Sequence, residues 1–372
     1  MITVLADDIT GAAEIAGVCL RYGLKVIFDF DFGLKQIPET DVWIIASDTR
    51  SMPEAGACER VGEVASFLFC RCGLDPQTHF IFKKIDSALR GHVIPEIETL
   101  LKYIHRKQTY ILPANPEYGR IIRDGVYYIN EKTLVETSFA DDPDFPAKSS
   151  LVKEIVHLPD NEKFILPDIL SEKDYFDYAK QLTSDILPVG ASIFFEACLQ
   201  TRFPLARKVE RKMMDFGENI LMICGSTHET SREFIHNMNN YSLVEIAINE
   251  IDTLLSDSEI FIKRIKYALD KYDSQKRLIV CVERKKASPA VSGKIKYLLA
   301  KISKYLLENA HIEELYIEGG ATAYACFQAN GFLSLIPVHE YARGVVRMKI
   351  IEKENLYVTI KPGSYVWPEK II

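Results

Sequence analysis

Short runs of β-branched and aromatic residues alternate with longer amphipathic stretches along most of the 372-residue chain. This alternation predicts βα units feeding a parallel sheet, because a parallel strand is reached through a crossover that is usually a helix. In the first half it predicts a doubly wound core with strands over residues 2–6, 25–30, 41–47, 79–85 and 109–113, and helices over residues 11–22, 53–71 and 92–105. Pro, Gly and Asp interrupt the pattern over residues 115–150, where a hairpin is expected.

A second α/β sheet is predicted after the charged stretch at residues 205–218. Its expected strands cover residues 219–226, 243–249, 277–283 and 314–320, and its expected helices cover residues 229–239, 256–271 and 288–308. Residues 344–365 should form two antiparallel strands joined at residues 352–355. Because one domain usually has about 100 to 200 residues, we expect two doubly wound α/β domains, over residues 1–210 and 211–372.

Composition narrows the class of partner. With 48% hydrophobic and 26% charged residues, the chain is an ordinary globular protein, which excludes disordered, collagen-like and coiled-coil proteins. The net charge is −7 without a long block of one sign, so a small-molecule partner is expected rather than nucleic acid or a membrane surface. No apolar run approaches the roughly 20 residues of a membrane span, and no cationic-then-apolar leader opens the chain, so a cytoplasmic location is expected.

The eight cysteines lie mostly in apolar stretches, which predicts buried, reduced thiols. Cys70 and Cys72 form a CxC pair without a second cysteine pair, which disfavours a metal site there.

Adjacent carboxylates follow the first predicted strand. Asp7 and Asp8 stand at its end, and Thr10 opens the next helix. Ligands of open α/β sheets bind outside the carboxyl ends of the strands, which favours a functional site here. One of these residues could instead cap the helix, but two consecutive acids cannot both do so.

Polar residues also follow two further predicted strands. Arg50 ends the stretch SDTR and could hold a carboxylate through a bidentate contact. The stretch KKIDSALRGH, residues 83–92, contributes two lysines, an arginine, a carboxylate and a hydroxyl, a set that suits an anionic, polyhydroxylated substrate. A solvated loop with incidental ion pairs is the alternative. Arg120 and Asp142, in Pro-rich segments, are weaker candidates.

Three Gly-containing turns follow strands of the second half: CGSTHE at residues 224–229, GGATA at residues 319–323 and KPGS at residues 361–364. The first two open helices, whose N-terminal amides and dipole attract phosphate. Ordinary tight turns are the alternative, since neither a Walker A spacing nor GxGxxG is present.

In this order the motifs resemble those of the four-carbon acid sugar kinase family. ADDITGA is similar to its DDxTGA opening, SDTRS to its DTRS turn, KKIDSALRG to its KKIDSTLRG signature and PANPEYGR to its P-A-x-P-x-x-GR stretch. In the second half GST, GGATA and KPGSY are similar to its later turns. The resemblance implies an N-terminal sugar-acid domain and a C-terminal ATP domain facing across a cleft. It also implies Mg²⁺-dependent phosphorylation of the 4-hydroxyl of a threonate, erythronate or 3-oxo-tetronate type acid.

The resemblance also implies roles for individual residues. Asp86, with Asp8 as the second choice, would orient the hydroxyl and take up its proton, and Lys84 would lie near the transferred phosphoryl group. Arg50 and Arg90 would hold the sugar carboxylate, and the remaining substrate-binding candidates are Asp7, Thr10, Ser87 and Arg120. The nucleotide would be lined by Ser226, Gly319, Gly320, Ala321, Thr322 and Gly363. The sequence assigns no metal ligand.

Two departures from the family pattern keep alternatives open. Ala88 replaces a Thr, which could change the acid that fits, and Ala321 stands where an acid is frequent. A non-catalytic sugar-acid binding or regulatory protein of the same fold therefore remains an alternative. A dehydrogenase is disfavoured because no glycine fingerprint follows the first strand. The sequence does not select among the acids, and a homodimer is only a base-rate expectation.

Overall fold

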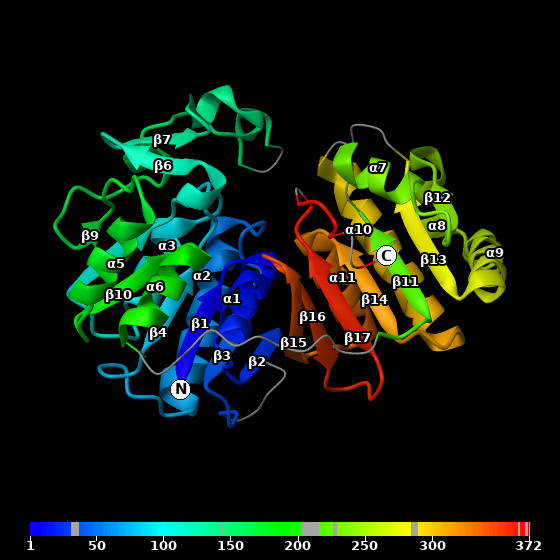
Figure 1. The fold of residues 1–372 in the computed structure, drawn as a ribbon, viewed down its shortest axis with the longest axis horizontal. Helices are drawn as coiled ribbons and strands as arrows, with labels where there is room; N and C mark the ends of the chain where they lie inside the picture. The colour runs from blue at the N-terminus through cyan, green and yellow to red at the C-terminus, as the bar shows by residue number, and fades with distance from the viewer. Residues whose placement is uncertain are drawn as a thin grey trace. The chain divides into compact units, whose positions relative to one another are not determined.

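Apolar strands flanked by amphipathic helices build an α/β sheet in each half of the chain (Figure 1). The computed structural model describes residues 1–30, 37–142, 145–202, 216–225, 229–283, 289–363, 365–368 and 371. The chain divides into two compact units, Met1–Val209 and Glu210–Ile372. The predicted α/β class is confirmed in both.

The sheet of the N-terminal unit is parallel throughout its described strands. Their order is β2-β3-β1-β4-β10-β5-β9. β1 is completely buried, as expected for a strand covered on both faces. The bounds are β1 Ile2–Ala6, β2 Val26–Phe30, β3 Val42–Ala46, β4 Ile81–Lys84, β5 Gln108–Leu112, β9 Phe164–Ile165 and β10 Ile186–Gly190.

Two groups of helices accompany this sheet. One contains α1, α5 and α6, with α6 in contact with both others, and the second contains α2 and α3. Phe82 of β4 packs against Phe194 and Phe195 of α6. The bounds are α1 Ile9–Arg21, α2 Glu54–Ser66, α3 Val93–Leu100, α5 Glu172–Gln181 and α6 Ser192–Arg202; a π-helical turn, Phe67–Arg71, extends α2.

A separate antiparallel sheet forms between β5 and β9 in the chain. Figure 1 shows β6 and β7 at the top of the N-terminal unit. We call residues 116–142 and 145–157 the hairpin lobe. It contains β6 Arg120–Arg123, β7 Val126–Ile129, β8 Lys132–Thr133, α4 Val152–Ile155 and the 3-10 turns Pro116–Tyr118, Leu134–Glu136 and Ser138–Asp141.

The C-terminal unit contains a mixed sheet with the order β12-β13-β11-β14-β17-β16-β15. The first five strands are parallel to their neighbours. β16 runs antiparallel to both β17 and β15. The strands are β11 Ile220–Cys224, β12 Ser242–Ile246, β13 Arg277–Val282, β14 Glu314–Glu318, β15 Ser334–Ala342, β16 Val345–Ile350 and β17 Tyr357–Lys361. The helices are α7 Glu229–His236, α8 Ile251–Ser256, α9 Ser258–Gln275, α10 Pro289–Asn309 and α11 Gly320–Asn330.

The sequence pattern missed β6 of the hairpin lobe and one strand in each of the larger sheets, and the latter two both contain a proline. Pro188 lies in β10, which pairs with β4 and β5, and Pro337 lies in β15 at a register shift. Because proline cannot donate a ladder hydrogen bond, it weakens the sequence signal for a strand.

The described residues include no helix that combines the length and apolar character of a membrane span. The eight cysteines are free, and five of them are buried, so the expectation of buried thiols holds for those five.

Two adjacent lysines at the end of β4 serve different partners, because successive side chains of a strand point to opposite faces. Lys83 forms an ion pair of 2.6 Å with Glu96 of α3, and the two side chains are 0% and 2% exposed. Lys84 instead lies against α1, beside Gly11. The buried Lys83–Glu96 pair thus fixes α3 to the sheet.

We expect Lys83→Met to lower the free energy of unfolding by roughly 3–5 kcal/mol, because it leaves the Glu96 carboxylate buried without its cation. The double variant Lys83→Met/Glu96→Leu should recover most of this loss, since it removes both charges. Chemical denaturation of the three proteins measures the effect. A double variant as unstable as the single one would contradict this account of the pair.

Candidate active site

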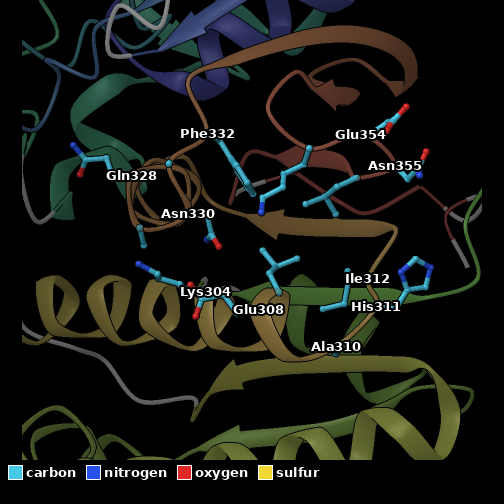
Figure 2. Close-up of a pocket in the computed structure, with 15 residues that line it drawn as sticks. Lys304, Glu308, Ala310, His311, Ile312, Gln328, Asn330, Phe332, Glu354 and Asn355 are labelled. Atoms are coloured by element: carbon cyan, nitrogen blue, oxygen red, sulfur yellow. The ribbon is translucent and has the colours of Figure 1, made fainter.

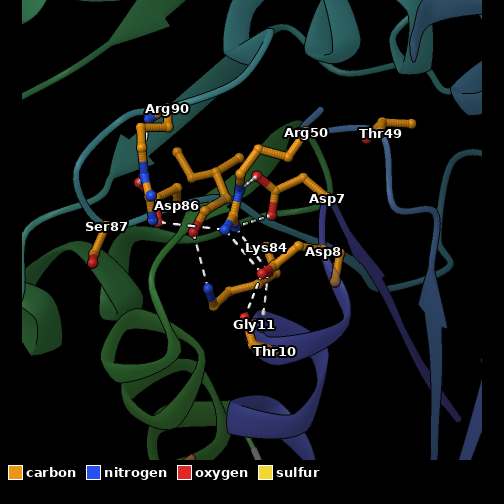
Figure 3. Close-up of polar contacts among 12 residues, drawn as sticks. Asp7, Asp8, Thr10, Gly11, Thr49, Arg50, Lys84, Asp86, Ser87 and Arg90 are labelled. Atoms are coloured by element: carbon orange, nitrogen blue, oxygen red, sulfur yellow. Dashed lines mark hydrogen bonds and ion pairs between the residues drawn. The ribbon is translucent and has the colours of Figure 1, made fainter. Parts of the chain in front are cut away.

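Polar side chains gather at the carboxyl ends of three neighbouring strands, with β1 between β3 and β4. Asp7 and Asp8 follow β1, Arg50 follows β3, and Asp86 follows β4 (Figure 3). The structure therefore brings together residues that are distant in the sequence, since Asp7 and Asp86 are 79 positions apart. This edge is where ligands of doubly wound sheets bind.

Arg50 joins the two carboxylates that follow β1. Its Nε and Nη2 donate to Asp7 at 3.0 and 2.9 Å, while Nη1 and Nη2 donate to Asp8 at 2.9 and 2.8 Å. Burial lowers the pKa of Arg50, but the attraction of the carboxylates outweighs burial and holds this pKa well above its ordinary value. Gly91, which packs against Arg50, has a φ of 94°, a conformation that residues with a side chain rarely adopt.

Asp8 also caps α1. Its carboxylate accepts hydrogen bonds from the Gly11 amide at 2.8 Å and from the Thr10 hydroxyl. Burial raises the pKa of Asp8, but Arg50, Lys84 and these hydrogen bonds outweigh it and leave the pKa lowered. Asp8 therefore has the capping role expected for an acid at this position, in addition to its contacts with Arg50. Asp7 binds Arg50 and does not cap the helix.

Asp86 organises the turn after β4. Its Oδ2 accepts from the amides of Ala88 and Arg90 and from Arg90 Nε, and its Oδ1 accepts from Arg90 Nη2 at 3.1 Å. Burial raises the pKa of Asp86, but Arg90 and Arg50 outweigh it and hold this pKa well below the ordinary value. Leu89 has a φ of 62°, a conformation that is uncommon for a side chain of this size and that often marks functional sites.

Lys84 lies against the first turn of α1. Its Nζ donates to the carbonyl of Ile85 at 3.0 Å and is 3.6 Å from Glu14. A Cβ on Gly11 would come within 2.8 Å of this Nζ and 2.6 Å of Asp8 Oδ1. Gly11 is therefore needed for the ammonium group and the Asp8 carboxylate to approach the helix together.

The hairpin lobe adds contacts to this turn. Arg120 donates to the Ser87 hydroxyl, and the Tyr127 hydroxyl donates to the Ser87 carbonyl. Asp142 accepts from Arg90 at 3.1 Å. The ring of Phe139 lies 5.3 Å from the guanidinium of Arg90 and 5.6 Å from that of Arg120. Tyr127 and Phe139 were not predicted, since a single aromatic residue in an irregular segment carries no periodic signal.

In the C-terminal unit, the GGATA turn joins β14 to α11. Gly319 is the N-cap, with a φ of 95° and no side-chain cap. The first amides of α11, at residues 320–322, have no partner within the helix, so they are available to a phosphate. At the adjacent end of β11, a Cβ on Gly225 would lie 2.3 Å from Thr322 Oγ1. Ser226, predicted to line the nucleotide, falls outside the described residues.

The KPG turn is closed around its own lysine. Lys361 Nζ donates to the carbonyls of Pro362 and Tyr365 and is 3.2 Å from Glu318. Both charged side chains of this pair are 0% exposed. The lysine thus fixes the turn that carries Gly363 next to β14, and its ammonium group is already used by these contacts.

A cavity of about 660 Å³ lies elsewhere in the C-terminal unit (Figure 2). It is lined by the end of α10, the end of α11 and the turn between β16 and β17, including Lys304, Asn330 and Asn355. None of the predicted site residues lines it. The candidate nucleotide site therefore rests on the turns and not on this cavity.

Metal ligands are not assigned by the structure. Among the residues it describes, no group of three or more His, Cys, Asp or Glu side chains is arranged to hold an ion. Asp7, Asp8 and Asp86 are instead engaged by arginines. Such a set does not fit a dedicated Mg²⁺ cage, although Mg²⁺ commonly binds through substrate phosphates and water.

Two family models together match most of the chain. A sugar-binding N-terminal domain matches residues 2–185, and a nucleotide-binding C-terminal domain matches residues 221–365. These matches confirm the predicted order of an N-terminal sugar-binding and a C-terminal nucleotide-binding domain.

Curated relatives agree with these models. A D-threonate kinase from Salmonella typhimurium is 26% identical, and the match covers 88% of this chain and 86% of that protein. A D-erythronate kinase from Heliobacterium modesticaldum and a 3-oxo-tetronate kinase from Brucella melitensis are each 30% identical, over 42% and 41% of this chain and 35% of each relative. The chain thus matches about a third of the length of these last two proteins.

A solved structure supports the same fold. Haemophilus influenzae protein HI1011, a DUF1537 protein, superposes with a TM-score of 0.72 at 16% identity, covering 98% of this chain and 96% of that one. The chain belongs to the four-carbon acid sugar kinase family.

Proposed function

We propose that this protein transfers the γ-phosphoryl group of ATP to the 4-hydroxyl of a four-carbon sugar acid. The observation that carries the proposal is the convergence of cations and ionised carboxylates at the ends of β1, β3 and β4, within the sugar-binding domain. A sugar acid needs a cation for its carboxylate and acceptors for its hydroxyls, and this edge offers both.

The C-terminal unit supplies the nucleotide side of the proposal. The uncapped amides at the start of α11 suit a phosphate group, and Gly319 and Gly225 allow the chain to approach closely there. Ala321 brings no carboxylate to this turn, so ribose or metal contacts of that kind would come from elsewhere. Mg²⁺ would accompany ATP through its phosphates, where it would neutralise charge.

The reaction forms a bond between the hydroxyl oxygen and the γ-phosphorus and breaks the bond to the oxygen that bridges the β- and γ-phosphorus atoms. A carboxylate must orient the hydroxyl and accept its proton as ADP departs. An ionised carboxylate has about four acceptor positions. Asp8 uses four with Thr10, Gly11 and Arg50. Asp86 also accepts four hydrogen bonds, but three of them fall on Oδ2. Its Oδ1 accepts one, from Arg90, and lies 3.7 Å from Arg50 Nη1, so this oxygen retains a position for a substrate hydroxyl.

ATP turnover tests this function. We expect the protein with Mg²⁺ to convert ATP to ADP in the presence of threonate, erythronate or 3-oxo-tetronate, with longer aldonates as control substrates. Turnover with one four-carbon acid would also identify the substrate. Binding of the acids without turnover would contradict the kinase and favour the binding-protein alternative, for which the absent acid at Ala321 is the supporting observation.

Asp86→Asn should lower kcat by roughly 100-fold or more, because the amide keeps the shape of the side chain but cannot take the proton. Asp142→Asn is the matched control: it also removes an ion pair with Arg90 but does not touch the proposed hydroxyl position. We expect it to change kcat by less than about tenfold. Equal losses in two folded variants would show that Arg90, not a base, is what both substitutions disturb.

The same proposal requires Asp86 to be ionised, which predicts how stability depends on pH. Its pKa is depressed in the folded protein, so its ionised form stabilises the fold above the ordinary Asp value of 3.8, and this contribution is lost as pH falls further. The difference in free energy of unfolding between wild type and Asp86→Asn should therefore shrink on acidification below about pH 4. Denaturation curves at several pH values measure it. A difference that grows on acidification would mean that folded Asp86 prefers its proton.

Gly225→Ala should raise the KM for ATP, because its Cβ would collide with Thr322 and shift the start of α11. We expect an increase of roughly tenfold, with a much smaller change in the KM for the acid. Gly293→Ala is the control, since a Cβ at Gly293 would meet no atom within 4 Å. An unchanged KM for ATP in Gly225→Ala would contradict the assignment of this turn to the nucleotide.

A further inference from the structure

We propose that Arg120, held in place by Phe139, binds the carboxylate of the acid and selects acids over neutral polyols. This inference rests on the proposed function, whose site it refines. It differs from the expectation that Arg50 and Arg90 hold the carboxylate. The arginines of the site differ in the protein groups to which they already donate hydrogen bonds.

Arg50 has its guanidinium directed at protein carboxylates. Each of its three nitrogens donates to Asp7 or Asp8, and its side chain is 14% exposed. Four of its five N–H groups donate in this way, so a substrate carboxylate could bind Arg50 in a bidentate manner only by displacing one of these hydrogen bonds. That displacement would leave a buried Asp without its cation, which is costly.

Arg90 is paired in a similar way. Its Nε and Nη2 donate to Asp86, and its Nη1 donates to Asp142. Asp86 raises the pKa of Arg90 above its ordinary value, as expected for a guanidinium fixed between acids. Three of its five N–H groups therefore donate to protein carboxylates, whereas Arg120 uses one of its five and donates it to a neutral hydroxyl.

Arg120 is different. It donates through Nη1 to Ser87, a neutral hydroxyl, and no described carboxylate lies within ion-pair distance of it. Its side chain is partly exposed, and Arg120 is close enough to Asp86 to help lower the pKa of that carboxyl. The guanidinium thus lies beside the proposed hydroxyl-orienting group with donors still available. A fork of such donors matches a carboxylate.

Charge pairing supports the same assignment. Among the described residues of this cluster, Arg50 pairs with Asp7 and Asp8, and Arg90 pairs with Asp86 and Asp142. The other two cations are Lys84, which lies at the start of α1 and is 3.6 Å from Glu14, and Arg120. The reaction has two anionic groups to neutralise, the transferred phosphoryl group and the substrate carboxylate. Lys84 suits the first, and Arg120 suits the second.

Phe139 packs against the guanidinium of Arg120. The aromatic ring lies within cation–π distance of both Arg90 and Arg120, at 5.3 and 5.6 Å from their guanidinium carbons. The ring therefore contacts both guanidinium groups. Phe139 is a positioning residue in this proposal, because it acts on the substrate through Arg120.

The test compares binding of the acid with binding of the neutral tetritol, which has the same hydroxyl pattern and CH₂OH in place of the carboxylate. Calorimetric titration gives the ratio of the two dissociation constants for each protein. We expect Arg120→Gln to reduce the preference for the acid by roughly 10- to 100-fold while tetritol binding changes little. Arg120→Lys, which keeps the charge without the fork, should retain part of the preference.

Arg123→Gln is the matched control. Arg123 lies on the same strand, is exposed and packs over Tyr128, so its loss should leave the ratio unchanged. Phe139→Leu should raise the KM for the acid roughly two- to fivefold with kcat unchanged. A loss of thermal stability in Phe139→Leu with an unchanged KM would reduce this residue to a structural role.

The outcomes separate this inference from the proposed function. A wild-type preference for the acid that persists in folded Arg120→Gln and Arg120→Lys overturns the inference, whether or not the enzyme turns over. Acid binding that depends on Arg120 without any ATP turnover supports the inference and contradicts the kinase. Wild-type protein that binds neither the acids nor the tetritols overturns both.

Discussion

The double fork between Arg50 and the adjacent acids Asp7 and Asp8 is the interaction on which the site depends. It joins the loops after β1 and β3, and its arginine reaches to 3.7 Å from Asp86 after β4. Bidentate contacts of this kind have a strict geometry, so they fix the relative positions of all three strand ends. The cost of burying these charges is offset because each has a partner, and the result is a rigid carboxylate cluster formed before substrate arrives.

The pairing of arginines with aspartates also determines which cations can bind the anionic groups of the substrates. Arg50 and Arg90 hold the protein's own acids, so we assign the anions of the proposed reaction to Lys84, which is 3.6 Å from Glu14, and to Arg120. In the C-terminal unit, Lys361 is likewise enclosed by the carbonyls of its own turn, so we propose the amides of α11 as the contact for phosphate. In each unit, one motif cation, Arg50 or Lys361, thus holds its motif in shape.

Much of this could be predicted from the sequence, because the motifs follow predicted strands and parallel strands end at the same edge. The sequence could not show that Asp8 uses its acceptor positions within the protein while Asp86 keeps one, since that depends on contacts across the turn. It also missed β10 and β15, whose prolines hide the strand pattern, and Phe139, which contacts the site from an irregular segment.

A crystal structure with a four-carbon sugar acid and a non-hydrolysable ATP analogue would test the central claim most directly. The account predicts the acid carboxylate on Arg120, its terminal hydroxyl on Asp86 Oδ1, and a nucleotide phosphate on the first amides of α11. An acid carboxylate bound to Arg50 in place of Asp7 or Asp8, or a nucleotide bound away from residues 319–322, would contradict it.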